Sequence, residues 1–255
     1  MSFTKKVVVI TGAASGVGTA IALGFAKLNA TLCIIDKNEK GLLKTKRNCE
    51  ELTKGKLLEI VADLTEDKEI KKIIETAVKE LGKINVLVNC AGILGSGSLQ
   101  DPDIVKRFDD AIAINLRSMV VMTKEALPAL IESKGCIINI SSVASTKMMA
   151  NMLAYRISKA GVTSFTKCTA FELASRGVRV NCISPGPVRT NIWSNAGVSE
   201  AEQDAIWDSL AGKMPLKMCV KGEEVAELAV YLAGDKAASI TGSDFVVDAG
   251  MMIGV

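Results

Sequence analysis

The sequence predicts an α/β fold, a doubly wound parallel sheet of about seven strands with helices on both faces. Three observations point to this fold. Short apolar runs alternate with helical stretches, the runs are rich in β-branched residues, and no repeat or Pro/Gly/Ser-rich linker divides the chain. Such runs are typical of parallel strands, which are buried on both faces and need crossover helices. We therefore expect residues 1–255 to form a single domain.

Four strands are expected in the first half of the chain. They are KKVVVI at 5–10, TLCIID at 31–36, LLEIVAD at 57–63 and NVLVNCAG at 85–92. A helix should follow the glycine-rich turn at 11–18 and run through Leu28, and a charged helix should cover 39–53. The stretch 66–82 predicts an amphipathic helix that Gly82 ends, with one apolar stripe made of Ile70, Ile73, Ile74 and Val78.

Three more strands are expected in the second half. They are CIINIS at 136–141, VRVNCISPG at 178–186 and SDFVVDAG at 243–250. Helices are expected at 104–133, where Pro128 marks a bend or boundary, and at 153–175 and 223–232. The segment 187–220 breaks the alternation and follows the carboxyl end of a strand, where open α/β sheets bind ligands. We expect this segment to be a mobile lid that orders when a ligand binds.

Composition excludes several classes of protein. Hydrophobic residues make up 49% and charged residues 23% of the chain, as in globular proteins. A net charge of +3 with scattered basic residues argues against a nucleic-acid partner. The longest uncharged stretch, 84–100, is broken by Asn, Gly and Ser, so no membrane span is expected. Histidine is absent, which excludes histidine catalysis and histidine-ligated metals, and we expect no metal site. Seven cysteines without a C-x-x-C pair indicate a reduced, cytoplasmic protein.

The first motif is the turn TGAASGVG at 11–18. Gly12 permits a tight turn, while Gly16 and Gly18 let backbone approach a pyrophosphate at a helix N-terminus. Its G-x-x-x-G-x-G spacing differs from the general dinucleotide fingerprint, and the lack of Gly-Lys-Ser/Thr excludes a nucleotide-hydrolysing loop. Together with the alternating pattern this favours a Rossmann-type fold. A glycine-rich turn that binds nothing is the alternative.

Asp36 ends the second expected strand, 24 residues after Gly12. An acid at about this offset accepts hydrogen bonds from the adenosine ribose of NAD, and its charge would repel the 2′-phosphate of NADP. We therefore expect NAD as cofactor. The alternative is that Asp36 caps a helix, a role for which Asn38 is an equal candidate. The adjacent Lys37 would partly offset the repulsion.

Tyr155 and Lys159 lie four residues apart, on one face of an expected helix. A phenol with an ordinary pKa of about 10 is a poor base near neutrality, and a nearby ammonium lowers that pKa. Ser142 follows the strand 136–141, at the same edge of the sheet as the glycine-rich turn, where its hydroxyl would polarise a substrate oxygen. The alternative for Tyr155 and Lys159 is that both are merely exposed residues of a helix. The alternative for Ser142 is that it caps a helix.

These residues resemble the classical short-chain dehydrogenases/reductases over essentially the whole chain. The resemblance rests on motifs whose order and spacing are specific: TGAASGVG at 11–18, Asp36, Asp63-Leu64, NCAG at 89–92, Asn115, Ser142, Tyr155-x-x-x-Lys159, Asn181 and SPGPVRT at 184–190. The chain departs from the family pattern at Cys90, where an amide usually ties adjacent strands, and at Ala249, where the family often has glycine. We expect the Cys90 change to affect stability rather than activity.

The resemblance implies a role for each catalytic residue. Tyr155 would be the general acid/base, Lys159 would lower its pKa and bind ribose, Ser142 would orient the substrate oxygen, and Asn115 would hold a water that relays protons. Asn89 would support the cofactor pocket. Cofactor contacts are implied for Gly12, Ser15, Gly16, Val17, Gly18, Asp36, Asp63, Leu64, Asn89, Ala91, Gly92, Tyr155, Lys159, Pro185, Gly186, Val188 and Thr190.

The substrate is expected to be a secondary alcohol or ketone. Two apolar segments are candidate walls of its pocket. The first segment, 143–153, contains Met148, Met149, Met152 and Leu153; the second, 187–218, contains Ile192, Trp193, Trp207, Leu210, Met214 and Leu216. Such a set suits a lipophilic substrate. Core or subunit-interface packing is the alternative for these residues, and sugar and 3-oxoacyl substrates stay open.

Three other hypotheses about the function compete with an NAD-dependent dehydrogenase. They are a carbonyl or 3-oxoacyl reductase that prefers NADP, a catalytically silent dinucleotide-binding scaffold, and a nucleotide-sugar epimerase or dehydratase. The resemblance also implies a homo-oligomer, a tetramer rather than a dimer, built from the helical regions 104–133 and 153–175 and the C-terminal strand. The apolar end MMIGV is consistent with burial at an interface.

Overall fold

The computed structural model describes residues 2–190 and 199–254. Within them, seven strands form one parallel sheet in the order β3-β2-β1-β4-β5-β6-β7. The strands are β1 (Val7–Thr11), β2 (Thr31–Asp36), β3 (Leu57–Val61), β4 (Val86–Asn89), β5 (Cys136–Ile140), β6 (Arg179–Pro185) and β7 (Asp244–Val247). The predicted sheet is confirmed. Its order places β1 next to β4: strands β1 to β3 follow one another toward one edge of the sheet, and strands β4 to β7 toward the other edge.

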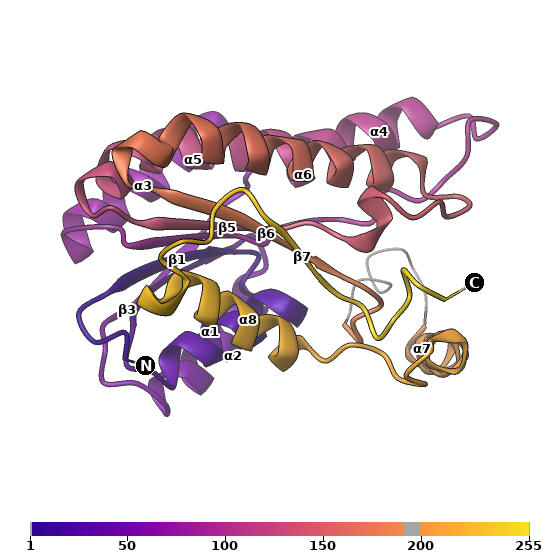
Figure 1. Ribbon diagram of the computed structural model, residues 1–255, viewed down its shortest axis with the longest axis horizontal. Helices are drawn as coiled ribbons and strands as arrows, with labels where there is room; N and C mark the ends of the chain where they lie inside the picture. Colours follow the sequence, from indigo (N-terminus) through magenta and orange to yellow (C-terminus); the bar gives the residue numbers. More distant parts are fainter. Residues whose placement is uncertain (1, 191–198, 255) are drawn as a thin grey trace.

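Helices cover both faces of the sheet (Figure 1). One face carries α1 (Gly16–Ala26), α2 (Glu39–Glu50) and α8 (Gly222–Ala233). The other face carries α3 (Asp67–Leu81), α4 (Ile104–Ile112), α5 (Ser118–Glu132) and α6 (Leu153–Leu173). None of the helices in the described part of the chain is long and apolar enough to cross a membrane.

The core lies in two layers, one on each side of the sheet. Successive side chains of β1 alternate between them: Val8 and Ile10 pack with Phe25 of α1, whereas Val9 packs with Ile73 of α3. All five β1 residues are buried. Burial on both faces explains why the strands are continuous apolar runs rather than alternating ones.

The predicted helix 104–133 is interrupted, but not where proline suggests. The break is a single π-helical turn at Ala113–Arg117, between α4 and α5. Pro128 lies inside α5. A proline removes the bond to the carbonyl four residues earlier, that of Lys124. Because both residues are exposed, water can serve that carbonyl and the helix continues.

One helix was not predicted. Glu200–Lys213 forms α7, in the segment where the sequence shows no apolar stripe. Its start carries a capping box: Ser199 accepts a bond from the Glu202 N–H, and the Glu202 carboxylate accepts one from the Ser199 N–H. The S-x-x-E spacing of a capping box is the sequence signal that could have revealed this helix.

Candidate active site

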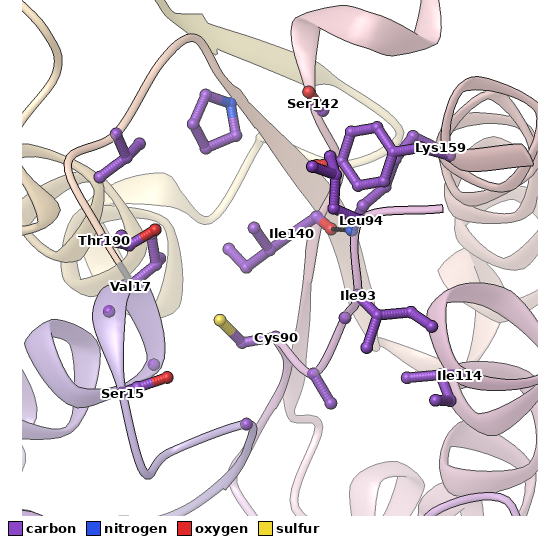
Figure 2. A pocket seen from close by; sticks show the side chains of 18 of the residues that line it. Ser15, Val17, Cys90, Ile93, Leu94, Ile114, Ile140, Ser142, Lys159 and Thr190 are labelled. Atoms are coloured by element: carbon purple, nitrogen blue, oxygen red, sulfur yellow. Dashed lines mark hydrogen bonds between the residues drawn. The ribbon is translucent and has the colours of Figure 1, made fainter. Parts of the chain in front are cut away.

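A cavity of about 600 Å³ opens at the carboxyl ends of the strands. Figure 2 shows Val17 and Thr190 on one side of it and Ile93, Ile114 and Lys159 on the other. Almost all predicted site residues line it: Gly12, Ser15, Gly16, Val17, Gly18, Asp36, Asp63, Leu64, Ala91, Gly92, Ser142, Tyr155, Lys159, Pro185, Gly186, Val188 and Thr190. Asn89 and Asn115 are not among the lining residues.

The glycine-rich turn brings backbone close to backbone. Gly12 has a φ of 69°, and a Cβ atom there would lie 2.7 Å from the Cα of Ala91. A Cβ on Gly18 would lie 2.1 Å from the carbonyl oxygen of Gly12. Ser15 is the N-cap of α1, but its side chain makes no capping hydrogen bond. The first N–H groups of α1 therefore face the cavity without a side-chain cap, an arrangement that suits a pyrophosphate.

Asp36 ends β2 and lines the cavity. Its carboxylate accepts hydrogen bonds from the backbone N–H groups of Ala14, at 3.0 Å, and Asn38, at 2.9 Å. The N-cap of α2 is Asn38, which accepts from the Gly41 N–H at 3.1 Å. These bonds fix the position of the Asp36 charge at the cavity wall and give the capping role to its neighbour.

Asp63 and Leu64 follow β3 at the same end of the cavity. The Asp63 carboxylate accepts from the backbone N–H and the hydroxyl of Thr65, both at 2.9 Å. These bonds, led by the backbone one and helped by the charge of Lys37, hold the pKa of Asp63 below its usual value. Leu64 is only 8% exposed and adds an apolar surface beside that charge.

The loop after β4 is held by Thr11, a residue for which no role of its own was predicted. Its hydroxyl oxygen accepts the N–H groups of Cys90, at 3.0 Å, and Ala91, at 3.2 Å. Cys90 lines the cavity, and burial raises the pKa of its thiol to about 12. A neutral thiol therefore faces the cavity where the family pattern has an amide.

Ser142, Tyr155 and Lys159 meet at one edge of the cavity. Ser142 caps the short helix Val143–Ser145 that follows β5, and its hydroxyl oxygen accepts the Ala144 N–H at 3.1 Å. The same hydroxyl acts on the Tyr155 phenol, whose pKa it lowers. Lys159 lies one turn along α6 from Tyr155. Its Nζ donates to the Ile140 carbonyl at 2.8 Å and lies 5.7 Å from the centre of the Tyr155 ring.

Burial decides the protonation of this group. It raises the pKa of Tyr155 above its ordinary value, although the Ser142 hydrogen bond acts in the opposite direction. It lowers the pKa of Lys159 to about 8. A lowered tyrosine pKa was predicted from the nearby ammonium; in this structure the net shift is upward, because the loss of solvation on burial is the largest effect.

Comparisons with known proteins agree with this geometry. A family model described as enoyl-(acyl carrier protein) reductase matches residues 12–252. Dehydrogenase/reductase SDR family member 6 of Aquarana catesbeiana is 38% identical over 249 residues, 96% of each chain. The chain belongs to the short-chain dehydrogenase/reductase family. It is therefore an oxidoreductase with the family's fold, as the sequence predicted.

Other members of the family match over equal lengths. The 3-oxoacyl-[acyl-carrier-protein] reductase FabG of Thermotoga maritima is 34% identical, over 99% of this chain and 100% of its own. Among solved structures, a Caenorhabditis elegans short-chain dehydrogenase/reductase of unknown function with cofactor has a TM-score of 0.94 at 30% identity, covering 99% and 97% of the two chains. NAD⁺-bound xylitol dehydrogenase has a TM-score of 0.88 at 26% identity, covering 98% and 100%.

In this short-chain dehydrogenase/reductase, Asn115 is fully buried in the π-helical turn. Its Oδ1 accepts the Ile93 N–H at 2.8 Å, and its Nδ2 donates to the Ile93 carbonyl at 3.0 Å and to the Ser158 hydroxyl at 2.9 Å. Both amide hydrogens are thus used within the protein. The side chain ties the α4–α5 junction to the loop after β4. The proton-relaying water that the resemblance implied stays a prediction.

Asn89 also acts from behind the cavity. It is buried at the end of β4, and its Nδ2 donates to Asn139 at 2.9 Å and to Thr123 at 3.3 Å. These bonds tie β4 to β5 and to α5. Asn89 thus holds the end of the strand that carries the NCAG loop and does not itself line the cavity. Its direct contact with a cofactor stays a prediction.

The residues after β6 close the cavity over the glycine-rich turn. Gly186 donates its N–H to the Val247 carbonyl at 2.8 Å, and Val188 forms an isolated bridge with Val220. A Cβ atom on Gly16 would lie 2.9 Å from the Cγ2 of Thr190. Only glycine at position 16 leaves room for this approach without displacing the Thr190 side chain.

The apolar wall combines expected and unexpected residues. Of the predicted set, Met149, Met152, Trp207 and Leu210 line the cavity. Met148 and Leu216 are instead exposed, at 80% and 68%, while Met214 is buried without lining it; Ile192 and Trp193 lie outside the described residues. Ile206 of the predicted segment 187–218 lines the cavity as well, whereas further apolar lining residues lie outside both predicted segments, among them Ile93, Leu94, Ile114 and Met251. Ile93 and Leu94 directly follow the NCAG motif at a strand end, which is the signal that could have found them.

Proposed function

We propose that this oxidoreductase transfers a hydride between NAD(H) and a lipophilic secondary alcohol or its ketone. The observation that carries the proposal is that Ser142, Tyr155 and the buried Lys159 line one edge of the cavity together. A substrate oxygen placed between the two hydroxyls would meet both a proton donor and a second polar contact. In the reverse reaction, the oxidation of an alcohol, Tyr155 accepts the proton of the alcohol hydroxyl.

The residues that line the cavity fit a nicotinamide dinucleotide. The uncapped N-terminus of α1 would bind the pyrophosphate, Asp36 the adenosine ribose, and Asp63 and Leu64 would border the adenine. Pro185, Gly186, Val188 and Thr190 would enclose the nicotinamide end. When bound, the dinucleotide supplies the hydride acceptor or donor, and the protein supplies orientation and electrostatics.

Tyr155, Ser142 and Lys159 would handle the proton. During ketone reduction, Tyr155 donates its phenolic proton to the carbonyl oxygen while Ser142 orients that oxygen. The Lys159 ammonium, held by the Ile140 carbonyl, stabilises the phenolate that remains. Asn115 contributes by fixing the loop that bears Ile93 beside this group.

NAD is favoured over NADP by the fixed charge of Asp36. Both carboxylate oxygens accept backbone N–H groups, so the charge is held at the wall where a 2′-phosphate would lie. The alternative, an NADP(H)-preferring carbonyl or 3-oxoacyl reductase, is supported by Lys37, which also lines the cavity. The similarity to FabG of Thermotoga maritima supports the same alternative.

A lipophilic substrate is favoured by the apolar wall. Two arginines that follow residues of the cavity wall, Arg156 and Arg189, do not line the cavity themselves. Arg156 donates to the Lys147 carbonyl at 2.9 Å, and Arg189 pairs with Asp204 of α7. Both guanidinium groups are thus engaged in contacts within the protein.

Three further features belong to the proposal. We infer a single domain of residues 1–255, with a lid at about 187–220. The lid is supported by α7, whose Ile206, Trp207 and Leu210 line the cavity. Equal proteolysis of this segment with and without NADH and substrate would count against a lid.

The oligomer and the location are the other two features. A homotetramer follows from the family resemblance, and a reducing, cytoplasmic location is supported by seven free cysteines.

Turnover of secondary alcohols tests the function. Purified protein would be incubated with NAD⁺ and a panel of secondary alcohols while NADH absorbance is followed, with Tyr155→Phe alongside. We expect turnover of at least one alcohol and a loss of at least about a hundredfold in kcat for the variant, with NADH still bound. Tight NADH binding without any turnover would favour a silent scaffold, and NADPH binding without NADH binding would favour the NADP alternative.

A further inference from the structure

The wall of the cavity includes a residue from the segment after β7, here called the tail and comprising residues 248–254. Met251 of the tail lines the cavity together with Met149, Trp207 and Leu210. It is 9% exposed and packs against Val143 and Met214. Because Val143 directly follows Ser142, the Met251 side chain lies near the edge where the catalytic hydroxyls meet.

The backbone of the tail turns Met251 inward. The Asp248 carboxylate accepts the N–H groups of Gly250, at 2.8 Å, and Met252, at 2.7 Å. Ala249 and Gly250 both adopt positive φ angles, 52° and 86°. The resulting turn buries Met251, while Met252 is 37% exposed. Of the two adjacent methionines, Met251 therefore faces the cavity and Met252 faces solvent.

Lys147 fastens this turn to the catalytic group. Its Nζ donates to the carbonyls of Met251, at 2.9 Å, and Gly254, at 3.4 Å. Its own carbonyl accepts from the Arg156 guanidinium at 2.9 Å, and Arg156 is the neighbour of Tyr155. The tail is therefore tied both to the loop that follows Ser142 and to the helix that bears Tyr155.

We propose that Met251 is a specificity-determining residue, which limits the length of the apolar substituent on the substrate's carbinol or carbonyl carbon. The proposal deepens the proposed function and rests on it. The charged lining residues Asp36, Lys37 and Asp63 belong to the loops after β2 and β3, whereas Met251 shares its wall with apolar side chains. The matching substrate is an uncharged ketone or secondary alcohol with an apolar substituent, and straight-chain methyl ketones are a series in which the length of that substituent alone varies.

The test is a chain-length profile. Straight-chain methyl ketones from butanone to dodecanone would be titrated calorimetrically into the NADH-bound protein carrying Tyr155→Phe, which blocks turnover, and kcat/KM would be measured for the same series with Tyr155 in place. With Met251 in place, both quantities should rise with chain length up to a limit. Met251→Ala removes three heavy atoms, so its limit should lie about three carbons higher. Each added carbon that finds apolar space should improve affinity roughly fourfold.

Two further variants make the test specific. Met251→Phe enlarges the side chain and should move the limit to shorter chains, so that the inference can be judged even if the alanine variant is unstable. Met252→Ala removes the exposed neighbouring methionine and should leave the profile unchanged. An unchanged limit in both Met251 variants, an equal shift in the Met252 variant, or no binding of any ketone would overturn the inference.

Lys147 provides an independent check. Lys147→Met should broaden the chain-length profile by releasing the tail, and it should add nothing in the Met251→Ala background if it acts through Met251. Additive shifts would contradict that coupling. If ketones bind with the expected shifts but none is reduced, the specificity role stands and the proposed function fails.

Discussion

Asp36 combines a charge with two backbone hydrogen bonds, so replacing it by asparagine separates these properties. Asp36→Asn removes the charge and keeps an oxygen that can accept the Ala14 N–H. We expect the ratio of NADPH to NADH affinity to rise by about tenfold or more, because the repulsion of a 2′-phosphate is lost. Dissociation constants measured by fluorescence titration would show this.

Glu39→Gln is the matched control for that variant. Glu39 lies in the first turn of α2, three residues from Asp36, and does not line the cavity. Its loss changes the net charge of the protein by the same amount. An equal change in cofactor preference in the two variants would mean that net charge, rather than the position of Asp36, sets the preference.

The buried Lys159 makes stability depend on pH. Its pKa is about 8 in the folded protein, against an ordinary value of 10.5. Below about pH 8 both states carry the proton, and folding bears the full cost of burying the ammonium. Between pH 8 and 10.5 the folded state releases the proton first, so the free energy of unfolding should rise with pH, by about 3 kcal/mol in total.

Urea unfolding of the wild type and Lys159→Met across this pH range would measure the effect. The difference between the two proteins should change between pH 8 and 10.5 and be constant below pH 8. Lys167→Met, which removes an exposed lysine of the same helix, serves as the control. A constant difference throughout the range would refute the lowered pKa of Lys159.

At the scale of elements, α1 offers two glycines in different surroundings. A Cβ on Gly18 would lie 2.1 Å from the Gly12 carbonyl oxygen, a backbone atom that cannot move aside easily. A Cβ on Gly24 would meet Ala226 of α8 at 3.4 Å, an ordinary contact. Gly18→Ala should therefore destabilise the protein by about 1–3 kcal/mol, whereas Gly24→Ala should stabilise it by up to about 1 kcal/mol.

Chemical denaturation of both variants checks this prediction. Similar changes in the two free energies of unfolding would mean that helix propensity, rather than the approach of α1 to the glycine-rich turn, controls the result. NADH affinity should also fall for Gly18→Ala and stay constant for Gly24→Ala, because only Gly18 lines the cavity.

Periodicity and strand composition predicted most elements and the sheet, because the strands are buried on both faces and their runs are unmistakable. They could not predict the π-helical turn at Ala113–Arg117, which depends on bonds from Asn115 to the distant Ile93 and Ser158. They also missed α7, whose apolar residues do not form a stripe.

The site could be predicted to a similar extent, and for related reasons. Residues at the carboxyl ends of strands were found because parallel strands bring these ends together. Met251 was not predicted as a lining residue, since its position depends on a turn with two positive φ angles and on a hydrogen bond from the distant Lys147. The apolar end of the chain instead suggested an interface.

At the scale of the whole molecule, exposed apolar side chains on the face of α4, α5 and α6 fit the proposed oligomer. Phe171 is 88% exposed and Val105 69%. We expect light scattering to give a mass of about four chains of 27.0 kDa at micromolar concentration, with Phe171→Glu shifting it downward. A mass near 27 kDa for the wild type would contradict the oligomer.

Of the seven cysteines, all within the described part of the chain, Cys168 alone is exposed. It lies three residues before Phe171, on the same side of α6. A maleimide dye should thus attach first at this helix, as the other thiols are buried or half-buried. The rate of that labelling would report, without any engineered tag, whether a second chain covers the helix: dilution that separates chains should accelerate it.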